Sequence, residues 1–285
     1  MNYQAPETIE NAIEMLSQAS GVVRILAGGT DVIVQMNAGL VEPDLIVDIK
    51  HIDELRTITA EDGGYRIGAA VSCASVTDHA GLTGMWPGCC EAAGLIGSTQ
   101  IQSRATMVGN LCNGSPAADS VPALVAAGAM VRVVGPNGSR DVAVGDIPTG
   151  PGKTSVAANE MVHSIYLPAQ AANSADAYLR FIPRTEMDIA VVGAGVNLTL
   201  DGSGQCTVAR VALGAVTETV LLVDEAANAL IGTSIDDAAL ENLAAAASAA
   251  CRPINDKRGT IEFRQKVAGV LAKRAAKIAV ERISG

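Results

Sequence analysis

Aromatic residues and positive charge are scarce in this sequence. The 285 residues include one tryptophan, four tyrosines and two phenylalanines, so stacking of bases on a platform of aromatic rings is poorly supported. Only 20 basic residues face 30 acidic ones, which gives a net charge of −10 at pH 7. A general nucleic-acid-binding protein needs a basic face that neutralises phosphates. The composition therefore predicts no nucleic-acid partner.

Long apolar runs are also missing. None reaches the roughly 18–20 residues that span a bilayer. The N-terminal residues carry acids in an amphipathic pattern, whereas a signal peptide has a basic start and an apolar stretch. We therefore expect a cytoplasmic protein without a membrane span. Because 49% of the residues are apolar, the chain has ample material for a core and is not expected to be disordered.

Metal-site and hydrolase motifs are absent as well. The six cysteines show no Cys-x-x-Cys spacing, which argues against a zinc knuckle or a self-contained iron–sulfur site. The histidines His51, His79 and His163 are scattered and lack the spacing of metal ligands. No Gly-x-Ser-x-Gly elbow of a hydrolase occurs. The sequence thus predicts no metal site in this chain.

Two common phosphate-binding motifs fail when their full patterns are tested. Residues 152–154 read Gly-Lys-Thr, like the end of a Walker A loop, but the position of its first glycine is Ile147. Residues 193–195 begin a dinucleotide fingerprint, yet its third glycine is replaced by Leu198. Neither an ATP loop nor a Rossmann site is expected.

The apolar pattern of the first 57 residues predicts a small βαβ unit. A helix is expected over 7–19, with Thr8 as its cap. A strand over 22–26, a helix over 32–40 and a strand over 45–49 follow.

Residues 58–172 are expected to form a mixed or antiparallel sheet module with helices. Strands are predicted at 56–59, 65–68, 130–134 and 161–167, with a hairpin turn at 135–138. Helices are predicted at 76–82 and 89–95. The segment 105–120, rich in Gly, Asn and Ser, is loop-like. An alanine-rich stretch, 169–176, is a candidate linker.

Residues 173–285 are expected to form an antiparallel three-stranded sheet followed by a helical bundle. The strands are predicted at 177–182, 189–200 and 206–215, and the helices at 224–231, 236–250 and 260–283. Ser234 is the expected cap of the second helix. The fold class is α+β, with domains 1–57, 58–172 and 173–285.

Two segments carry the best candidates for a binding site. Residues 26–31, Leu-Ala-Gly-Gly-Thr-Asp, end a predicted strand, and the glycines allow backbone N–H groups to approach an anion closely. A plain structural turn is the alternative for this segment. Residues 105–120 are flanked by apolar residues, so their backbone groups need partners, which a polar ligand could supply. Asp119 would suit a ribose or ribityl hydroxyl, since a carboxylate accepts strongly from hydroxyls.

These two segments, about 80 residues apart, resemble the FAD-binding medium subunit of the molybdenum hydroxylases, the family of xanthine dehydrogenase and carbon monoxide dehydrogenase. The resemblance covers nearly the whole chain. Further supporting stretches are 46–49, 55–58, 65–69, 149–154, 177–181, 187–190 and 212–216.

The resemblance implies which residues bind FAD. The first pyrophosphate loop would consist of Arg24, Ile25, Leu26, Ala27, Gly28, Gly29, Thr30 and Asp31. The second would consist of Thr106, Met107, Val108, Gly109 and Asn110, with Val108 in place of a frequent family glycine. Asp119 matches an acid near the ribityl chain, and Val162 an apolar position beside the flavin ring. Arg180 replaces a frequent lysine near the ring, and Ile96 an aromatic residue of some relatives.

The resemblance also implies a multi-subunit oxidoreductase. A large subunit would hold the molybdenum cofactor, a small subunit two 2Fe–2S clusters, and this chain FAD, which would pass electrons from the clusters to an external acceptor, with NAD⁺ as one candidate. The complex would be a heterotrimer or a dimer of heterotrimers. No catalytic acid or base is expected in this chain.

The sequence is also compatible with other functions. The chain could be a self-contained FAD oxidase of the vanillyl-alcohol type, although 285 residues leave little room for a substrate domain, or a non-enzymatic nucleotide-binding assembly protein. Arg180 could be a surface arginine, and Val162 a core residue. The basic residues of the last helix form either a solvated face or a surface for an acidic partner.

Overall fold

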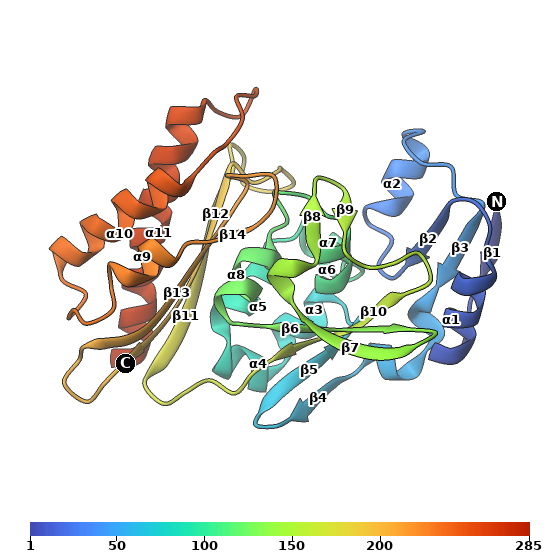
Figure 1. Cartoon of the computed structure of the whole chain (residues 1–285), viewed down its shortest axis with the longest axis horizontal. Helices are drawn as coiled ribbons and strands as arrows, with labels where there is room; N and C mark the ends of the chain where they lie inside the picture. Colours follow the sequence, from blue (N-terminus) through green and yellow to red (C-terminus); the bar gives the residue numbers. More distant parts are fainter.

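A three-stranded parallel sheet lies at one end of the computed structural model, which describes residues 1–285 (Figure 1). Its strand order is β1-β3-β2. Its elements are β1 (Asn2–Gln4), α1 (Ile9–Gln18), β2 (Val23–Leu26), α2 (Val32–Asn37) and β3 (Leu45–Asp48). The predicted βαβ unit is confirmed, and Thr8 caps α1 by accepting a hydrogen bond from the N–H of Asn11. Strand β1 was not predicted, because its three exposed residues show no apolar alternation.

The middle of the chain forms a five-stranded antiparallel sheet of order β4-β5-β10-β6-β7. Its strands are β4 (Ile58–Glu61), β5 (Gly64–Gly68), β6 (Met130–Gly135), β7 (Gly138–Ala143) and β10 (Met161–Leu167), and a small pair is added by β8 (Pro148–Gly150) and β9 (Lys153–Thr154). The predicted hairpin turn joins β6 to β7. The prediction of a mixed or antiparallel sheet is therefore confirmed, and all of its strand pairs are antiparallel.

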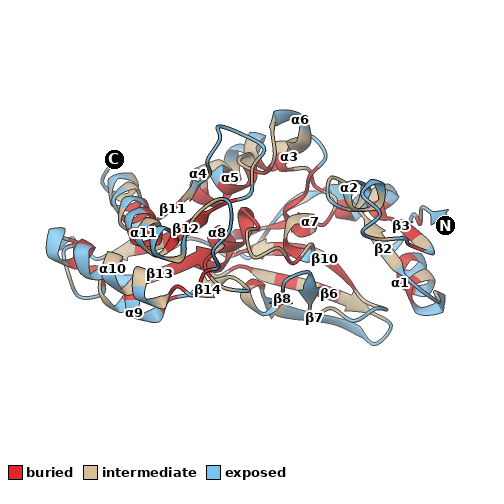
Figure 2. Cartoon of the chain, turned by 90° about the horizontal axis from the view of Figure 1, so that it is seen from above, coloured by how far each residue is buried: buried red, intermediate tan, exposed pale blue.

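Six helices accompany this sheet, and Figure 2 shows most of them on one side of it. They are α3 (Cys73–Asp78), α4 (Ala80–Met85), α5 (Pro87–Gly94), α6 (Thr99–Gln102), α7 (Met107–Cys112) and α8 (Ser120–Ala126). The single helix predicted over 76–82 is wrong. His79 interrupts it, because its ring accepts a hydrogen bond from the N–H of Leu82 and caps a new helix.

The expectation of a loop over 105–120 is wrong for residues 107–112, which form α7, whereas residues 113–119 lie outside helices and strands as expected. Thr106 caps α7 by accepting a hydrogen bond from the N–H of Gly109 at 2.8 Å. Met107 and Leu111 are buried on the inner side of this helix. Burial of an apolar face stabilises a short helix more than residue propensity does, so the glycine and asparagine residues do not prevent it.

The C-terminal part contains an antiparallel sheet of order β11-β12-β13-β14. Its elements are β11 (Ser174–Phe181), β12 (Val192–Leu200), β13 (Cys206–Gly214), β14 (Leu221–Leu222), α9 (Asp224–Asn228), α10 (Asp237–Ala250) and α11 (Ile261–Ser284). The two-residue strand β14 corrects the prediction of three strands. Strand β11 takes up the end of the predicted linker. Asp236, rather than Ser234, caps α10, because its carboxylate accepts from the N–H of Ala239.

The basic residues of α11 do not form a free solvated face. Arg264 is buried, and it donates to Asp256 at 2.7 Å and to the carbonyl of Val191 at 2.7 Å. Further along the helix, Lys273, Lys277 and Arg282 pair with Glu241, Asp237 and Glu91, respectively. Most of these charges are therefore used within the chain.

Helix α8 lies between the middle sheet and the C-terminal sheet, and arginines of the C-terminal sheet contact both of its ends. Arg180 on β11 donates to Asp119, the N-cap of α8, at 2.8 Å. Arg210 on β13 donates to the carbonyls of Val125 and Ala126 at its end. Figure 2 shows α9, α10 and α11 on the other side of this sheet. The C-terminal sheet thereby supports the helix that follows the predicted second loop.

Candidate functional site

A cleft of about 500 Å³ lies between the N-terminal sheet and the middle module. This volume is within the range of roughly 300–1,000 Å³ found for small-molecule sites. Most of the residues predicted to bind the cofactor line it: Arg24, Ile25, Ala27, Gly28, Gly29, Thr30, Asp31, Thr106, Val108, Gly109, Asn110 and Val162. The structure thus brings both predicted segments to one cleft.

The first segment lies at the carboxyl end of β2, where parallel sheets commonly bind ligands. A Cβ atom on Gly28 would lie 2.0 Å from the carbonyl oxygen of Arg104. Gly29 has a φ of +79°, which disfavours residues with a Cβ. Gly28 is therefore required for the turn to pack against the segment that leads into α7, and Gly29 is required for the backbone conformation of the turn.

The turn presents backbone donors without protein acceptors. The N–H groups of residues 27–31 donate to no carbonyl or side chain of the chain. Consecutive N–H groups of this kind form a nest for an anion. Arg24 also lines the cleft, is exposed, and donates only to the neighbouring carbonyl of Val23. This edge of the cleft therefore suits a negatively charged group such as a pyrophosphate.

The opposite wall is formed by α7 and the residues that follow it. Asn110 faces the cleft from this helix. Gln35 of α2 donates through Nε2 to Oδ1 of Asn113 at 2.9 Å, and both residues line the cleft. Gln35 was not predicted from the sequence, and Asn113 was predicted only as a member of the candidate segment 105–120. Gln35 stands four residues after Asp31, one helical turn further on the same helix face, and this spacing could have identified it.

Apolar side chains line the deeper part of the cleft. Ile96 lines it and is 8% exposed. Val162, at the start of β10, also lines the cleft. It is buried, so it contributes both to the cleft wall and to the hydrophobic core. Further apolar lining residues that were not predicted from the sequence include Leu16, Val23, Ile49, Val156 and Met161. Such a surface suits a flat aromatic ring system.

Four predicted residues lie outside the lining: Leu26, Met107, Asp119 and Arg180. Met107 packs into the core. Asp119 turns toward β11, where it forms an ion pair with Arg180 whose side chains are 12% and 5% exposed, respectively. Arg180 is therefore no surface arginine.

The carboxyl group of Asp119 in this ion pair has a shifted pKa and an oxygen without a hydrogen-bond partner. Burial raises the pKa of Asp119 to about 6, although the charge of Arg180 acts in the opposite direction. Its Oδ1 atom has no hydrogen-bond partner in the chain, and neither has the hydroxyl of the buried Tyr178.

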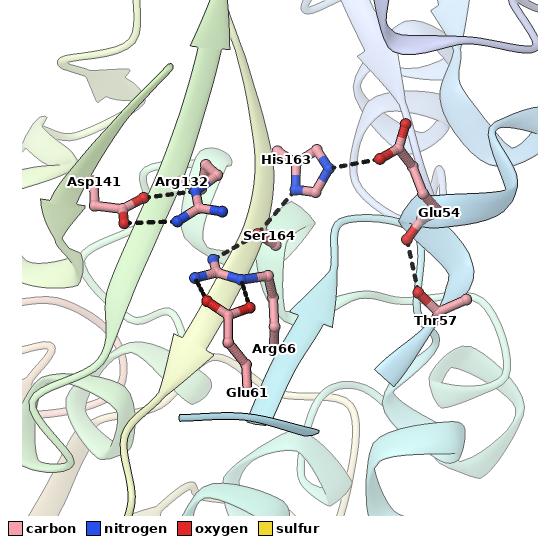
Figure 3. A network of polar contacts seen from close by, with 8 residues as sticks. All are labelled: Glu54, Thr57, Glu61, Arg66, Arg132, Asp141, His163 and Ser164. Carbon is pink, nitrogen blue, oxygen red and sulfur yellow. Dashed lines mark hydrogen bonds and ion pairs between the residues drawn. The ribbon is translucent and has the colours of Figure 1, made fainter. Parts of the chain in front are cut away.

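A series of polar contacts holds the part of β10 that directly follows Val162 (Figure 3). The strand register shifts between Val162 and Ser164, so that His163 occupies a bulge. The ring of His163 contacts Ser164 Oγ at 2.9 Å and Glu54 at 3.3 Å. The order Glu–His–Ser is that of a catalytic triad, but Ser164 is 0% exposed and accepts a hydrogen bond from Arg66. These contacts therefore serve to fasten β10 to β5 and to the N-terminal module.

Comparisons with known protein families cover both parts of the chain. Residues 1–170 match the family described as the FAD binding domain in molybdopterin dehydrogenase. Residues 177–279 match the CO dehydrogenase flavoprotein C-terminal domain. No group of three or more His, Cys, Asp or Glu side chains is placed to hold a metal ion. No helix has the length and apolar character to cross a membrane.

Individual proteins are similar over nearly the full length. The chain is 33% identical to the carbon monoxide dehydrogenase medium chain of Afipia carboxidovorans, over 99% of this chain and 97% of that protein. It is 30% identical to the putative xanthine dehydrogenase FAD-binding subunit of Escherichia coli K12, over 100% of this chain and 97% of that protein. The solved structure of reconstituted CO dehydrogenase from Oligotropha carboxidovorans has a TM-score of 0.95 at 33% identity, covering 99% of this chain and 98% of that one.

Proposed function

The chain belongs to the family of FAD-binding medium subunits of molybdenum-containing dehydrogenases, and we propose that it is the electron-transfer flavoprotein subunit of a molybdenum hydroxylase complex. The observation that carries the proposal is the set of free N–H groups at residues 27–31, which face a cleft with an apolar interior. A dinucleotide with a pyrophosphate and two flat rings has this combination of charge and apolar surface. FAD fits the donors and the walls of this cleft.

Different residues of the chain would bind different parts of FAD. The turn at 27–31 and Arg24 would bind the pyrophosphate, and Asn110 would donate to it from the opposite wall. Val162 and Ile96 would contact a ring. When bound, FAD supplies redox chemistry that no amino-acid side chain supplies, while the protein orients it and controls its surroundings.

Membership of this family supports a proposal about the partners of the chain. We propose a large subunit with the molybdenum cofactor and a small subunit with two 2Fe–2S clusters that deliver electrons to this chain, in a heterotrimer or a dimer of heterotrimers. An external acceptor, with NAD⁺ as one candidate, would then receive the electrons. A cytoplasmic location is supported by the cysteines, since all six are free thiols and thiols persist in a reducing compartment.

Purification of the complex tests the proposal directly. The chain would be isolated with its native partners, and the released chromophore identified by its mass after the iron–sulfur absorption is subtracted. We expect about one FAD per chain. A complex with intact clusters and no flavin would overturn the proposal and favour an assembly protein. FAD together with substrate turnover by the chain alone would favour a self-contained oxidase.

Loss of the hydrogen bond between Gln35 and Asn113 is expected to speed the release of FAD. No residue of α2 is buried, so this bond tethers the helix to α7 across the cleft. In Gln35→Met the side chain keeps its length but cannot donate. A hydrogen bond contributes about 1 kcal/mol, so dissociation should become about fivefold faster, as measured by trapping the released flavin.

The matched control for this prediction is Val34→Met on the same helix. Val34 is 63% exposed and does not line the cleft, so FAD release should stay at the wild-type rate. An unchanged release rate in Gln35→Met would show that α2 needs no tether to retain the cofactor.

A further inference from the structure

The oxygen and the nitrogen of the Asn110 side-chain amide lie in different surroundings. The residue lines the cleft from α7. Its Oδ1 atom points to the start of α8, where it accepts from the backbone N–H of Ser120 at 3.1 Å and from the Ser120 hydroxyl at 2.8 Å. Its Nδ2 group donates to no acceptor in the chain. One side-chain amide therefore connects two helices through its oxygen and keeps its NH₂ group free.

The contacts of Ser120 determine which way this amide is turned. A backbone N–H can only donate, so the atom that faces it must be the oxygen of Asn110. With the amide reversed, an NH₂ group would face the N–H of Ser120 without any hydrogen bond. The hydroxyl of Ser120 adds a second donor to the same oxygen. The amide orientation thus follows from the protein contacts alone and exists before any ligand binds.

Ser120 acts on the cleft only through Asn110. The side chain of Ser120 is 0% exposed and does not line the cleft. It is the first residue of α8, directly after Asp119, whose contact with Arg180 anchors the same helix end. Ser120 is therefore held in place from the C-terminal sheet.

We propose that Ser120 is a positioning residue, which holds the Asn110 amide with its NH₂ group toward the diphosphate of the bound dinucleotide. The ligand atom would be an anionic phosphate oxygen, since the free end of the amide can only donate. This inference rests on the proposed function, because it assigns a donor to the FAD-binding cleft.

The test is a double-mutant cycle in the complex stripped of flavin. The dissociation constant of FAD would be measured by flavin fluorescence in the wild type, Ser120→Ala, Asn110→Ala and the double variant. We expect Ser120→Ala to weaken FAD binding about five- to tenfold. In the Asn110→Ala background, the same change should alter the constant less than about twofold, because the residue through which it acts is gone. An equal loss in both backgrounds, or no loss in Ser120→Ala, would overturn the proposal.

Two further variants keep the test decisive. Ser115→Ala removes another serine from the connection between α7 and α8, where its hydroxyl accepts only from the N–H of Ala117, and FAD binding should stay within about twofold of the wild type. Asn110→Asp keeps the oxygen that faces Ser120 and replaces the free NH₂ by a second oxygen. It should fold normally and bind FAD more than about tenfold more weakly. Wild-type affinity in Asn110→Asp would overturn the assignment, whereas no FAD binding by the wild type would reject the proposed function itself.

Discussion

Replacement of Gly28 by alanine is expected to remove FAD from the protein. The added Cβ would lie 2.0 Å from the carbonyl oxygen of Arg104 and 3.0 Å from the Cα of Ala105. Both are backbone atoms, so no change of rotamer relieves the contact. The turn must move away from the segment that leads into α7, and the donors on the two walls of the cleft then no longer converge.

The expected size of this effect follows from the cost of overpacking. Forcing extra atoms into a packed region costs about 1–3 kcal/mol, which corresponds to a loss of affinity of about 5- to 150-fold. We expect the purified Gly28→Ala complex to contain little FAD, measured as flavin per chain after release. Iron–sulfur absorption in the proposed partner subunit should persist, because this chain is not expected to hold the clusters.

A second glycine provides the control. Gly84 lies in α4, outside the cleft, and a Cβ on it would meet no atom within 4 Å. Gly84→Ala should retain full FAD and gain about 0.5–1 kcal/mol of stability from the better helix propensity of alanine. A Gly28→Ala complex with one FAD per chain would show that the close approach of the two backbones is dispensable for binding.

The parts of the site that are contiguous in the sequence were predictable. The turn over 26–31 follows an apolar strand and contains two glycines, and both features are local. Because a strand ends at a sheet edge, such a turn is at the surface with its backbone groups available. The structure places it at the rim of the cleft.

Contacts between distant segments could not be predicted in this way. Gln35 and Asn113 are 78 positions apart, and Asp119 and Arg180 are 61 apart. Each contact exists only after separate modules have packed against each other, so no local pattern indicates it. The family resemblance assigned Arg180 to the flavin ring, whereas the structure pairs it with Asp119 behind the cleft.

Removal of Arg180 should destabilise the chain strongly, and more so at high pH. In Arg180→Leu the carboxylate of Asp119 loses its only ion-pair partner in a buried site, a change that typically costs about 3–5 kcal/mol. Burial already raises the pKa of Asp119 to about 6, and Arg180 lowers it, so its loss raises the pKa further. In the pH range between the pKa of Asp119 in the unfolded chain, about 4, and its higher pKa in the folded variant, the folded chain binds one more proton than the unfolded chain. Its stability therefore falls as the pH rises through that window.

Urea denaturation of the flavin-free chain at pH 5 and pH 8 measures this dependence. At pH 5 Asp119 is mostly protonated in the folded variant, so the penalty of Arg180→Leu should be well below its value at pH 8. Arg180→Lys, which keeps the charge, should lose less stability at pH 8. The double variant Asp119→Asn with Arg180→Leu removes the stranded charge and should recover part of the loss. The same penalty at both pH values would mean that the lost packing of the arginine side chain, rather than the unpaired carboxylate, sets the cost.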